Sequence, residues 1–296
     1  MEITAQLVKE LRERSGVGMM DCKTALKETN GDLEAALTWL REKGIAKAAK
    51  KQSRIAAEGL CSVVENGNTA ILFELNSETD FVSKNDSFLN FLSSLTKLFG
   101  SKLPSNDAEA LALTLDGKSV ETLISELTFT IGEKISLRRV TKVTKNNDQV
   151  FGSYTHGGGR IVTLVVANGA NAEAAKDVAM HVAAINPQYV DQSQVPAAEV
   201  EKEKQILTQE ALNEGKPAAI VEKMVLGRVN KFLKDICLVN QPFVKNPDVS
   251  VEQFLKPLGM SVASFTRLAV GEGIEKEESD FAQEVVTVSK TFSDSM

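Results

Sequence analysis

Hydrophobic residues near the start of the chain recur every three or four positions, and glycines interrupt them. Thr4 and Asp32 are suited to cap helices, and residues 21–29 form another helical stretch between them. Gly16 marks the break after the first helix because glycine frees the backbone to turn. The pattern predicts three short helices packed as a bundle. The basic stretch that follows, residues 43–54, is predicted to be a helical or flexible connector.

From residue 59 the hydrophobic period changes to that of strands. Residues 60–64 and 69–75 flank Asn66-Gly67, a pair typical of the tight turn of a β-hairpin, in which both turn residues adopt positive φ. The elements predicted next are helices over residues 85–99 and 120–129 and a strand over residues 135–144. Residues 102–116 look like a variable excursion and receive no assignment.

The same order of elements recurs in the second half of the chain. Two predicted strands flank the turn Gly157-Gly158-Gly159, and a helix over residues 171–185 follows them. A last strand is predicted over residues 261–270. We interpret the chain as two copies of a hairpin, helix and strand unit.

Two amphipathic helices interrupt the second copy. The first begins at Pro196, and Gly215-Lys216-Pro217 separates it from the second. Their apolar residues have coiled-coil-like spacing, which predicts an antiparallel helical hairpin that projects from the core. The tail after residue 272 is mostly polar but keeps Phe281 and Val285 at helical spacing, and it is predicted to form a short docking helix.

Composition limits the class of protein. The chain has 34 basic and 40 acidic residues, a net charge of −6, which argues against a general nucleic-acid binder. The three cysteines are far apart in sequence, so a disulfide framework or zinc site is not expected and a reducing, cytoplasmic compartment is. The first residues lack the pattern of a signal peptide, and no apolar run approaches the length of a membrane span.

Few residues suggest bond-making chemistry. The chain lacks the phosphate-loop motif of nucleotide-binding proteins. Its two histidines, His156 and His181, have no second histidine or cysteine nearby in sequence, so a structural role is favoured over metal binding or general-base catalysis. We therefore expect no enzymatic activity, no bound metal and no cofactor.

Two features suggest contact with another protein. Phe81 lies in a polar loop between Glu78 and Lys84, although the pattern alone favours its burial in the protein's own core because most phenylalanines are buried. Met19 and Met20 adjoin a glycine-rich turn and suit an adaptable contact surface, although packing within the bundle is the alternative and is favoured for one of the two.

Several segments, in order along nearly the whole chain, closely resemble the bacterial elongation factor Ts family. They are residues 7–23, Glu78-Thr79-Asp80-Phe81-Val82, Ile131-Gly132-Glu133, Leu137-Arg138-Arg139, Met180-His181-Val182-Ala183-Ala184, Gln241-Pro242-Phe243 and residues 270–276.

The resemblance implies an α+β fold in four parts. An N-terminal three-helix, UBA-like module would cover residues 1–54, and the first α+β core subdomain residues 55–145. The second, similar subdomain would cover residues 146–271, with a coiled-coil hairpin inserted at about 195–235. A C-terminal helical module would follow from residue 272.

The resemblance also implies a function. Members of the family are guanine-nucleotide exchange factors for elongation factor Tu, binding its GDP-bound and nucleotide-free forms. The loop formed by Thr79, Asp80, Phe81 and Val82 would enter the partner's GTPase domain and disturb its magnesium site. Further partner contacts carry over to the set Arg12, Met19, Met20, Ile131 and His156, and the coiled-coil hairpin is a possible homodimer contact. No direct contact with nucleic acid or membrane is expected.

Two other functions remain open on the residues alone. A helical-hairpin adaptor would bind a partner without releasing nucleotide. A hydrolase built around His156 or His181 would need partner residues that the sequence does not reveal.

Overall fold

Three helices form the N-terminal module of the computed structural model, which describes residues 3–215 and 217–275. They are α1 (Ala5–Ser15), α2 (Met19–Glu28) and α3 (Leu33–Lys51). As predicted, the Thr4 hydroxyl caps α1 by accepting from Leu7 N, and the Asp32 carboxylate accepts from Ala35 N at the start of α3. These caps satisfy backbone donors that have no partner within the helix, so each helix begins where its capping residue stands.

The third helix is longer than predicted, because it continues through most of the basic connector. Gly44 lies in its middle, and a Cβ at this position would lie 2.6 Å from the Phe129 ring of α6 (Val120–Ile131). Glycine therefore lets the two helices approach closely, and Phe129 joins the apolar cluster of the bundle. Arg41 also pairs with Glu126 of α6 at 3.1 Å. These contacts dock the N-terminal module onto the rest of the chain.

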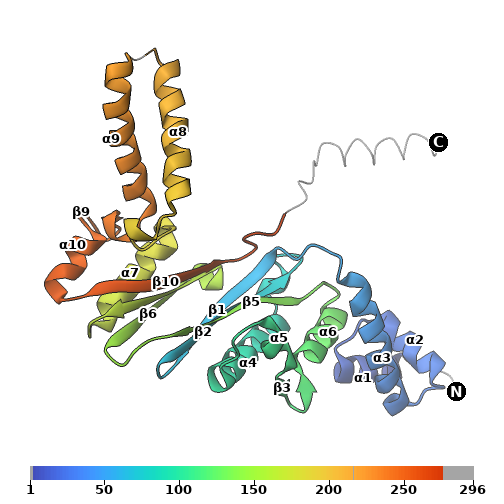
Figure 1. Cartoon of the computed structure of the whole chain (residues 1–296). Helices are drawn as coiled ribbons and strands as arrows, with labels where there is room; N and C mark the ends of the chain where they lie inside the picture. The colour runs from blue at the N-terminus through green and yellow to red at the C-terminus, as the bar shows by residue number, and fades with distance from the viewer. Residues whose placement is uncertain (1–2, 216, 276–296) are drawn as a thin grey trace, which may run out of the picture.

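Two three-stranded antiparallel sheets follow, with the same connectivity (Figure 1). The first has the order β1 (Glu58–Asn66), β2 (Thr69–Ser77), β5 (Ser136–Thr144), and the second has the order β10 (Ser261–Ala269), β7 (Ile161–Asn168), β6 (Gln149–His156). In both, the second strand of the hairpin is central and the later strand pairs with it. A helix follows each hairpin, α4 (Asp86–Lys102) in the first unit and α7 (Ala172–Ile185) in the second, as the hairpin, helix and strand pattern predicts.

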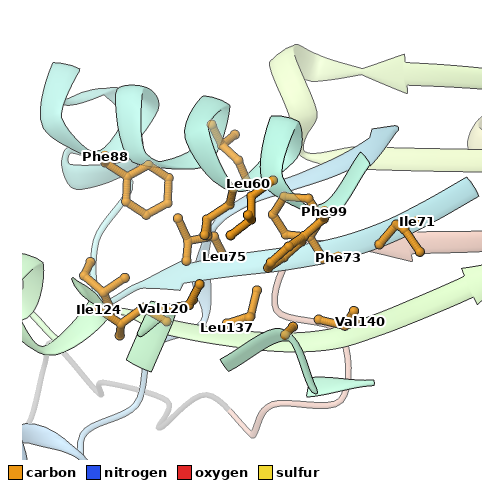
Figure 2. Packing of buried hydrophobic residues seen from close by; sticks show 14 of the residues in the cluster. Leu60, Ile71, Phe73, Leu75, Phe88, Phe99, Val120, Ile124, Leu137 and Val140 are labelled. Atoms are coloured by element: carbon orange, nitrogen blue, oxygen red, sulfur yellow. The ribbon is translucent and has the colours of Figure 1, made fainter. Parts of the chain in front are cut away.

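Alternation along the strands explains how both faces of a sheet are buried. On β2, Ile71 and Phe73 face α4, whereas Ala70 and Leu72 belong to a cluster shared with the second sheet. The two sheets therefore pack on each other through one face, and helices cover the outer face of each (Figure 1). Figure 2 shows the core between the first sheet and α4, where the rings of Phe73 and Phe99 meet edge to face with centroids 4.9 Å apart.

The turn of the first hairpin differs from the prediction. Asn66 pairs with Thr69, so the two turn residues are Gly67 and Asn68 rather than Asn66 and Gly67. Gly67 has a φ of 60°, and it is the turn residue with positive φ. A turn that requires positive φ only at its first central position suits a glycine there and leaves the next residue unrestricted.

The segment left unassigned at residues 102–116 is structured. It contains α5 (Asp107–Ala112) and β3 (Thr114–Leu115), which pairs with β4 (Lys118–Ser119). The Asp107 carboxylate accepts from Val140 N at 2.6 Å, which fastens the segment to β5. This contact spans 33 residues of sequence, so local pattern did not reveal it.

The inserted helical hairpin projects from the second sheet as predicted (Figure 1). It consists of α8 (Ala197–Asn213) and α9 (Ala218–Ile236), whose facing residues Leu207, Ala211, Val221 and Val225 form an apolar seam. The short elements β8 (Pro242–Phe243), β9 (Asn246–Ser250) and α10 (Val251–Leu255) then lead to β10. The predicted tail helix with Phe281 and Val285 lies outside the described residues.

Candidate functional site

The loop after β2 is held by hydrogen bonds within its own turns. Ser77 Oγ donates to the Thr79 carbonyl at 2.9 Å, and Ser83 Oγ donates to the Asp80 carbonyl at 2.8 Å. A short 3-10 helix, Val82–Lys84, follows Phe81 and leads into Asn85, which caps α4. The backbone on both sides of Phe81 is therefore fixed.

A second segment, 54 residues further along the chain, supports the loop from outside. The Glu133 carboxylate accepts from both Thr79 N, at 2.9 Å, and Thr79 Oγ, at 2.8 Å. Next to it, Lys134 N donates to Glu78 at 2.6 Å. Glu133 belongs to the motif Ile131-Gly132-Glu133, but nothing in the sequence indicated its role.

Asp80 carries a charge at the rim of the loop. Its carboxylate lies 2.7 Å from Lys84 Nζ, and its side chain is 39% exposed. The hydrogen bond from Lys84 is the main cause that lowers the pKa of Asp80, with a further contribution from the nearby charge of Arg160. Asp80 is therefore anionic at neutral pH.

Two adjacent residues of the loop, Phe81 and Val82, differ in how far their side chains are exposed. Phe81 is 79% exposed, so the self-burial that the pattern alone favoured is wrong. Val82 is only 8% exposed and packs in the cluster that contains Phe88 and Leu95. The side chain of Val82 therefore anchors the loop to its own core in the free protein.

Ile131 and His156 differ in exposure. Ile131 ends α6, two residues before Glu133, and is partly buried against the first core cluster. His156 is exposed at the end of β6, with its Nδ1 3.5 Å from the Tyr154 hydroxyl. The glycine turn after His156 packs closely on β1, since a Cβ on Gly159 would lie 3.0 Å from the Cys61 carbonyl. That close approach accounts for the glycine there.

Arg12, Met19 and Met20 lie together in sequence on the N-terminal module. The Arg12 carbonyl accepts from Gly16 N, and Gly16 has a φ of 68°, which ends α1. Met19 and Met20 begin α2, two residues earlier than predicted, and are 53% and 73% exposed. The bundle-packing alternative therefore fails for both methionines.

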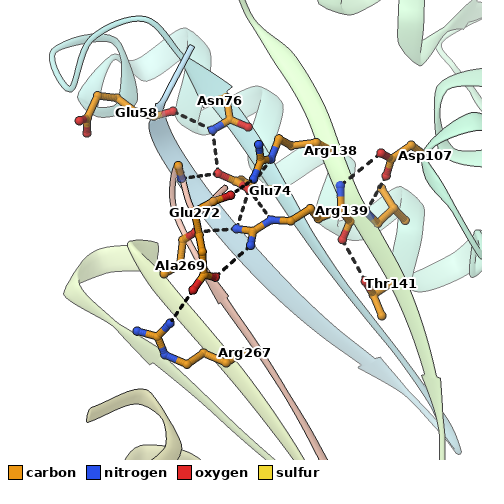
Figure 3. A network of polar contacts seen from close by, with 12 residues as sticks. Glu58, Glu74, Asn76, Asp107, Arg138, Arg139, Thr141, Arg267, Ala269 and Glu272 are labelled. Carbon is orange, nitrogen blue, oxygen red and sulfur yellow. Dashed lines mark hydrogen bonds and ion pairs between the residues drawn. The ribbon is translucent and has the colours of Figure 1, made fainter. Parts of the chain in front are cut away.

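A buried polar network that the sequence pattern did not predict joins the two sheets (Figure 3). Glu74 of β2 is fully buried, and its carboxylate accepts from Arg138 at 2.9 Å and from Arg139 at 2.7 Å. Gly271 N donates to the same carboxylate at 2.7 Å, and Arg139 also reaches Glu272 at 3.1 Å. These contacts fasten the end of β10 to the first sheet. The Arg-Arg pair was visible in the sequence, but its buried acidic partner was not.

His181 has a structural role. It is fully buried, its Nε2 lies 2.9 Å from Gln241 Oε1, and its Nδ1 accepts from Val244 N at 3.1 Å. Burial lowers the pKa of His181, an effect that the hydrogen bond with Gln241 partly opposes. Both ring nitrogens thus hold α7 against the segment around β8.

Among residues 3–215 and 217–275, no group of three or more His, Cys, Asp or Glu side chains could hold a metal ion. None of the helices described there is long and apolar enough to cross a membrane. Burial raises the pKa of Cys61 to about 12, so this side chain is a neutral thiol at physiological pH.

The chain matches a known protein family. The family model described as elongation factor TS matches residues 78–272, about two thirds of the chain. The match begins at the loop that presents Phe81 and ends at the Glu272 of the buried network. It includes the inserted helical hairpin.

Proposed function

This chain belongs to the elongation factor Ts family of translation elongation factors, and we propose that it is the guanine-nucleotide exchange factor for elongation factor Tu. It binds the GDP-bound partner, promotes GDP release and holds the nucleotide-free form. The protein itself catalyses no bond-making step and needs no cofactor. Exchange requires only that it bind the empty partner better than the loaded one, because each ligand then weakens the other by linkage.

The observation that carries the proposal is the exposed Phe81 on a fixed loop. A phenylalanine that is 79% exposed in the free protein gains burial only when a partner supplies a pocket. Asp80 beside it adds a negative charge at the same rim. We propose that Phe81 enters between helices of the partner's GTPase domain and disturbs its magnesium site, with Thr79 and Asp80 at the edge of that contact.

Magnesium is the relevant target because it bridges the phosphates of a bound nucleotide and offsets their charge. Displacing its ligands weakens the hold on GDP without any chemical change in the nucleotide. In this mechanism the residues of this chain act by contact alone. Phe81 supplies apolar area, and the hydrogen bonds to Thr79 keep the loop in place during insertion.

Other surfaces complete the proposed complex. The exposed Arg12, Met19 and Met20 form a second contact on the N-terminal module, and the exposed His156 forms a third. Ile131 is partly buried, and the accessible part of its side chain is proposed to contact the partner. The helical hairpin is proposed to mediate homodimerisation.

The test is a stopped-flow assay of fluorescent GDP release from elongation factor Tu. Catalytic amounts of the protein should accelerate release, and calorimetry should detect no GTP or GDP binding to the protein alone. Binding without faster release would favour the adaptor function instead. Hydrolysis of the nucleotide by the protein alone would refute the proposal that it is not an enzyme.

A further inference from the structure

We propose that Glu133 positions Phe81 for nucleotide exchange, an inference that rests on the proposed exchange function. Glu133 is half-buried, and it receives two hydrogen bonds from one residue, Thr79, which stands two positions before Phe81. One bond comes from the backbone and the other from the side chain, so they restrain Thr79 in two directions. Hydrogen bonds to an ionised acceptor are stronger than those between neutral groups.

Glu133 is itself held in place by the end of α6. Gly132 follows the helix with a φ of 91° and donates its N–H to the Thr128 carbonyl at 3.0 Å. This left-handed conformation suits glycine and turns the chain sharply, so that Glu133 points back toward the loop. On the other side of the turn, Ile135 N donates to Thr128 Oγ at 3.1 Å.

The contact between the turn and the loop is paired and reciprocal. Thr79 donates to Glu133, and one residue earlier Glu78 accepts from Lys134 N at 2.6 Å. The two segments are therefore joined at successive positions, with donors and acceptors on both. This arrangement keeps the loop from rotating about a single contact.

The same turn also supports the N-terminal module. Lys134 Nζ donates to the carbonyls of Gln52, at 2.6 Å, and Arg54, at 2.9 Å, just past the end of α3. Arg54 in turn reaches the Glu78 carboxylate at 3.3 Å. The Gly132–Lys134 turn thus connects the module that carries Met19 and Met20 to the loop that carries Phe81. A partner that binds the N-terminal module would therefore find the Phe81 loop at a fixed distance from that module.

This geometry separates the positioning of Phe81 from binding. Loss of the Glu133 carboxylate leaves Phe81 present and exposed but frees the segment that aims it. A side chain on a fixed loop inserts more readily than one on a mobile loop, because less conformational entropy is lost when it is inserted. We therefore expect the maximal release rate to fall while the concentration for half-saturation changes little.

The experiment measures GDP release from loaded elongation factor Tu over a range of protein concentrations. Glu133→Ala should lower the maximal rate about tenfold, the loss expected for charge-assisted hydrogen bonds. Its half-saturating concentration should stay within about twofold of wild type, since the other contacts remain. Glu133→Gln keeps one acceptor oxygen and should recover part of the rate, and Glu65→Ala on the exposed end of β1 is the matched control.

A double-mutant cycle decides whether Glu133 acts through Phe81. In a Phe81→Ala background, Glu133→Ala should reduce release by less than about twofold, because the side chain that it aims is gone. Two effects that multiply instead would show that Glu133 acts independently of Phe81, and they would overturn the proposal. An unchanged maximal rate for both Glu133 variants would overturn it as well.

A measurement on the free protein separates this inference from the proposed function. Hydrogen exchange of the Thr79 amide should be faster in Glu133→Ala than in wild type, with circular dichroism unchanged. Equal exchange rates would refute the support of the loop by Glu133 whatever the partner does. If the wild-type protein does not accelerate GDP release from elongation factor Tu, the proposed exchange function is wrong. The predicted effect of Glu133 on the release rate is then wrong as well.

Discussion

Replacing Phe81 with alanine should slow GDP release strongly and leave the free protein almost as stable as wild type. The ring is 79% exposed, so only about a fifth of its burial energy is realised in the free protein. Full burial of a phenylalanine side chain is worth about 1.5–3 kcal/mol. The expected loss in free energy of unfolding is therefore about 0.3–0.6 kcal/mol, within the range of ordinary surface substitutions.

The remaining four fifths of the ring can be buried only in the complex. That fraction corresponds to about 1.2–2.4 kcal/mol of stabilisation for the state in which the partner is opened. At about 1.4 kcal/mol for each factor of ten, the maximal release rate should fall about 7- to 50-fold. Chelating magnesium should reduce this defect, because the variant then no longer has to disturb that site.

Two controls make the assay specific. Leu89→Ala removes an apolar side chain that is 39% exposed on α4, and it should cost about 0.9–1.8 kcal/mol of stability while leaving release by folded protein almost unchanged. Phe88→Leu changes a fully buried ring of the same core and should lower the urea midpoint without slowing release by folded protein. A Phe81→Ala protein with a large loss of stability, and with release reduced only in proportion to unfolded molecules, would refute the insertion mechanism.

Three further predictions concern other parts of the chain. Arg12→Ala, or Met19→Ala combined with Met20→Ala, should weaken affinity for the partner by about 2 kcal/mol, measured by calorimetry, and an unchanged affinity with a lower melting temperature would contradict this. Because burial holds the pKa of His181 below its unfolded value, the unfolded state binds more protons and stability should fall as pH drops below about 6.5. Urea titrations from pH 7.5 to 5 should show a smaller decline for His181→Asn, and an equal decline would exclude His181 as the cause. Replacing residues 207–225 with a short glycine linker removes facing parts of both hairpin helices and should leave the core folded by circular dichroism while weakening self-association; an insoluble protein would contradict the model of an inserted hairpin.

Local sequence determined where most elements begin and end. Thr4 and Asp32 cap their helices because a short polar side chain meets a backbone donor only three residues away. The seam of the helical hairpin follows from the period of its apolar residues. The burial of both faces of β2 follows from its continuous apolar run, residues 70–73. The contact role proposed for the Phe81 loop rests on the resemblance to a family, whereas the pattern alone favoured burial of Phe81.

Only the tertiary structure decided which side chains of that loop are available. Phe81 and Val82 are adjacent apolar residues, and nothing in their order indicates that one is exposed and the other anchored. The loop that carries both residues is also held by Glu133, which reaches Thr79 from 54 residues away. The buried Glu74 likewise gains its partners Arg138 and Gly271 only when the two sheets meet. Such contacts form only when distant segments pack together. They therefore do not appear in the local hydrophobic pattern of the sequence.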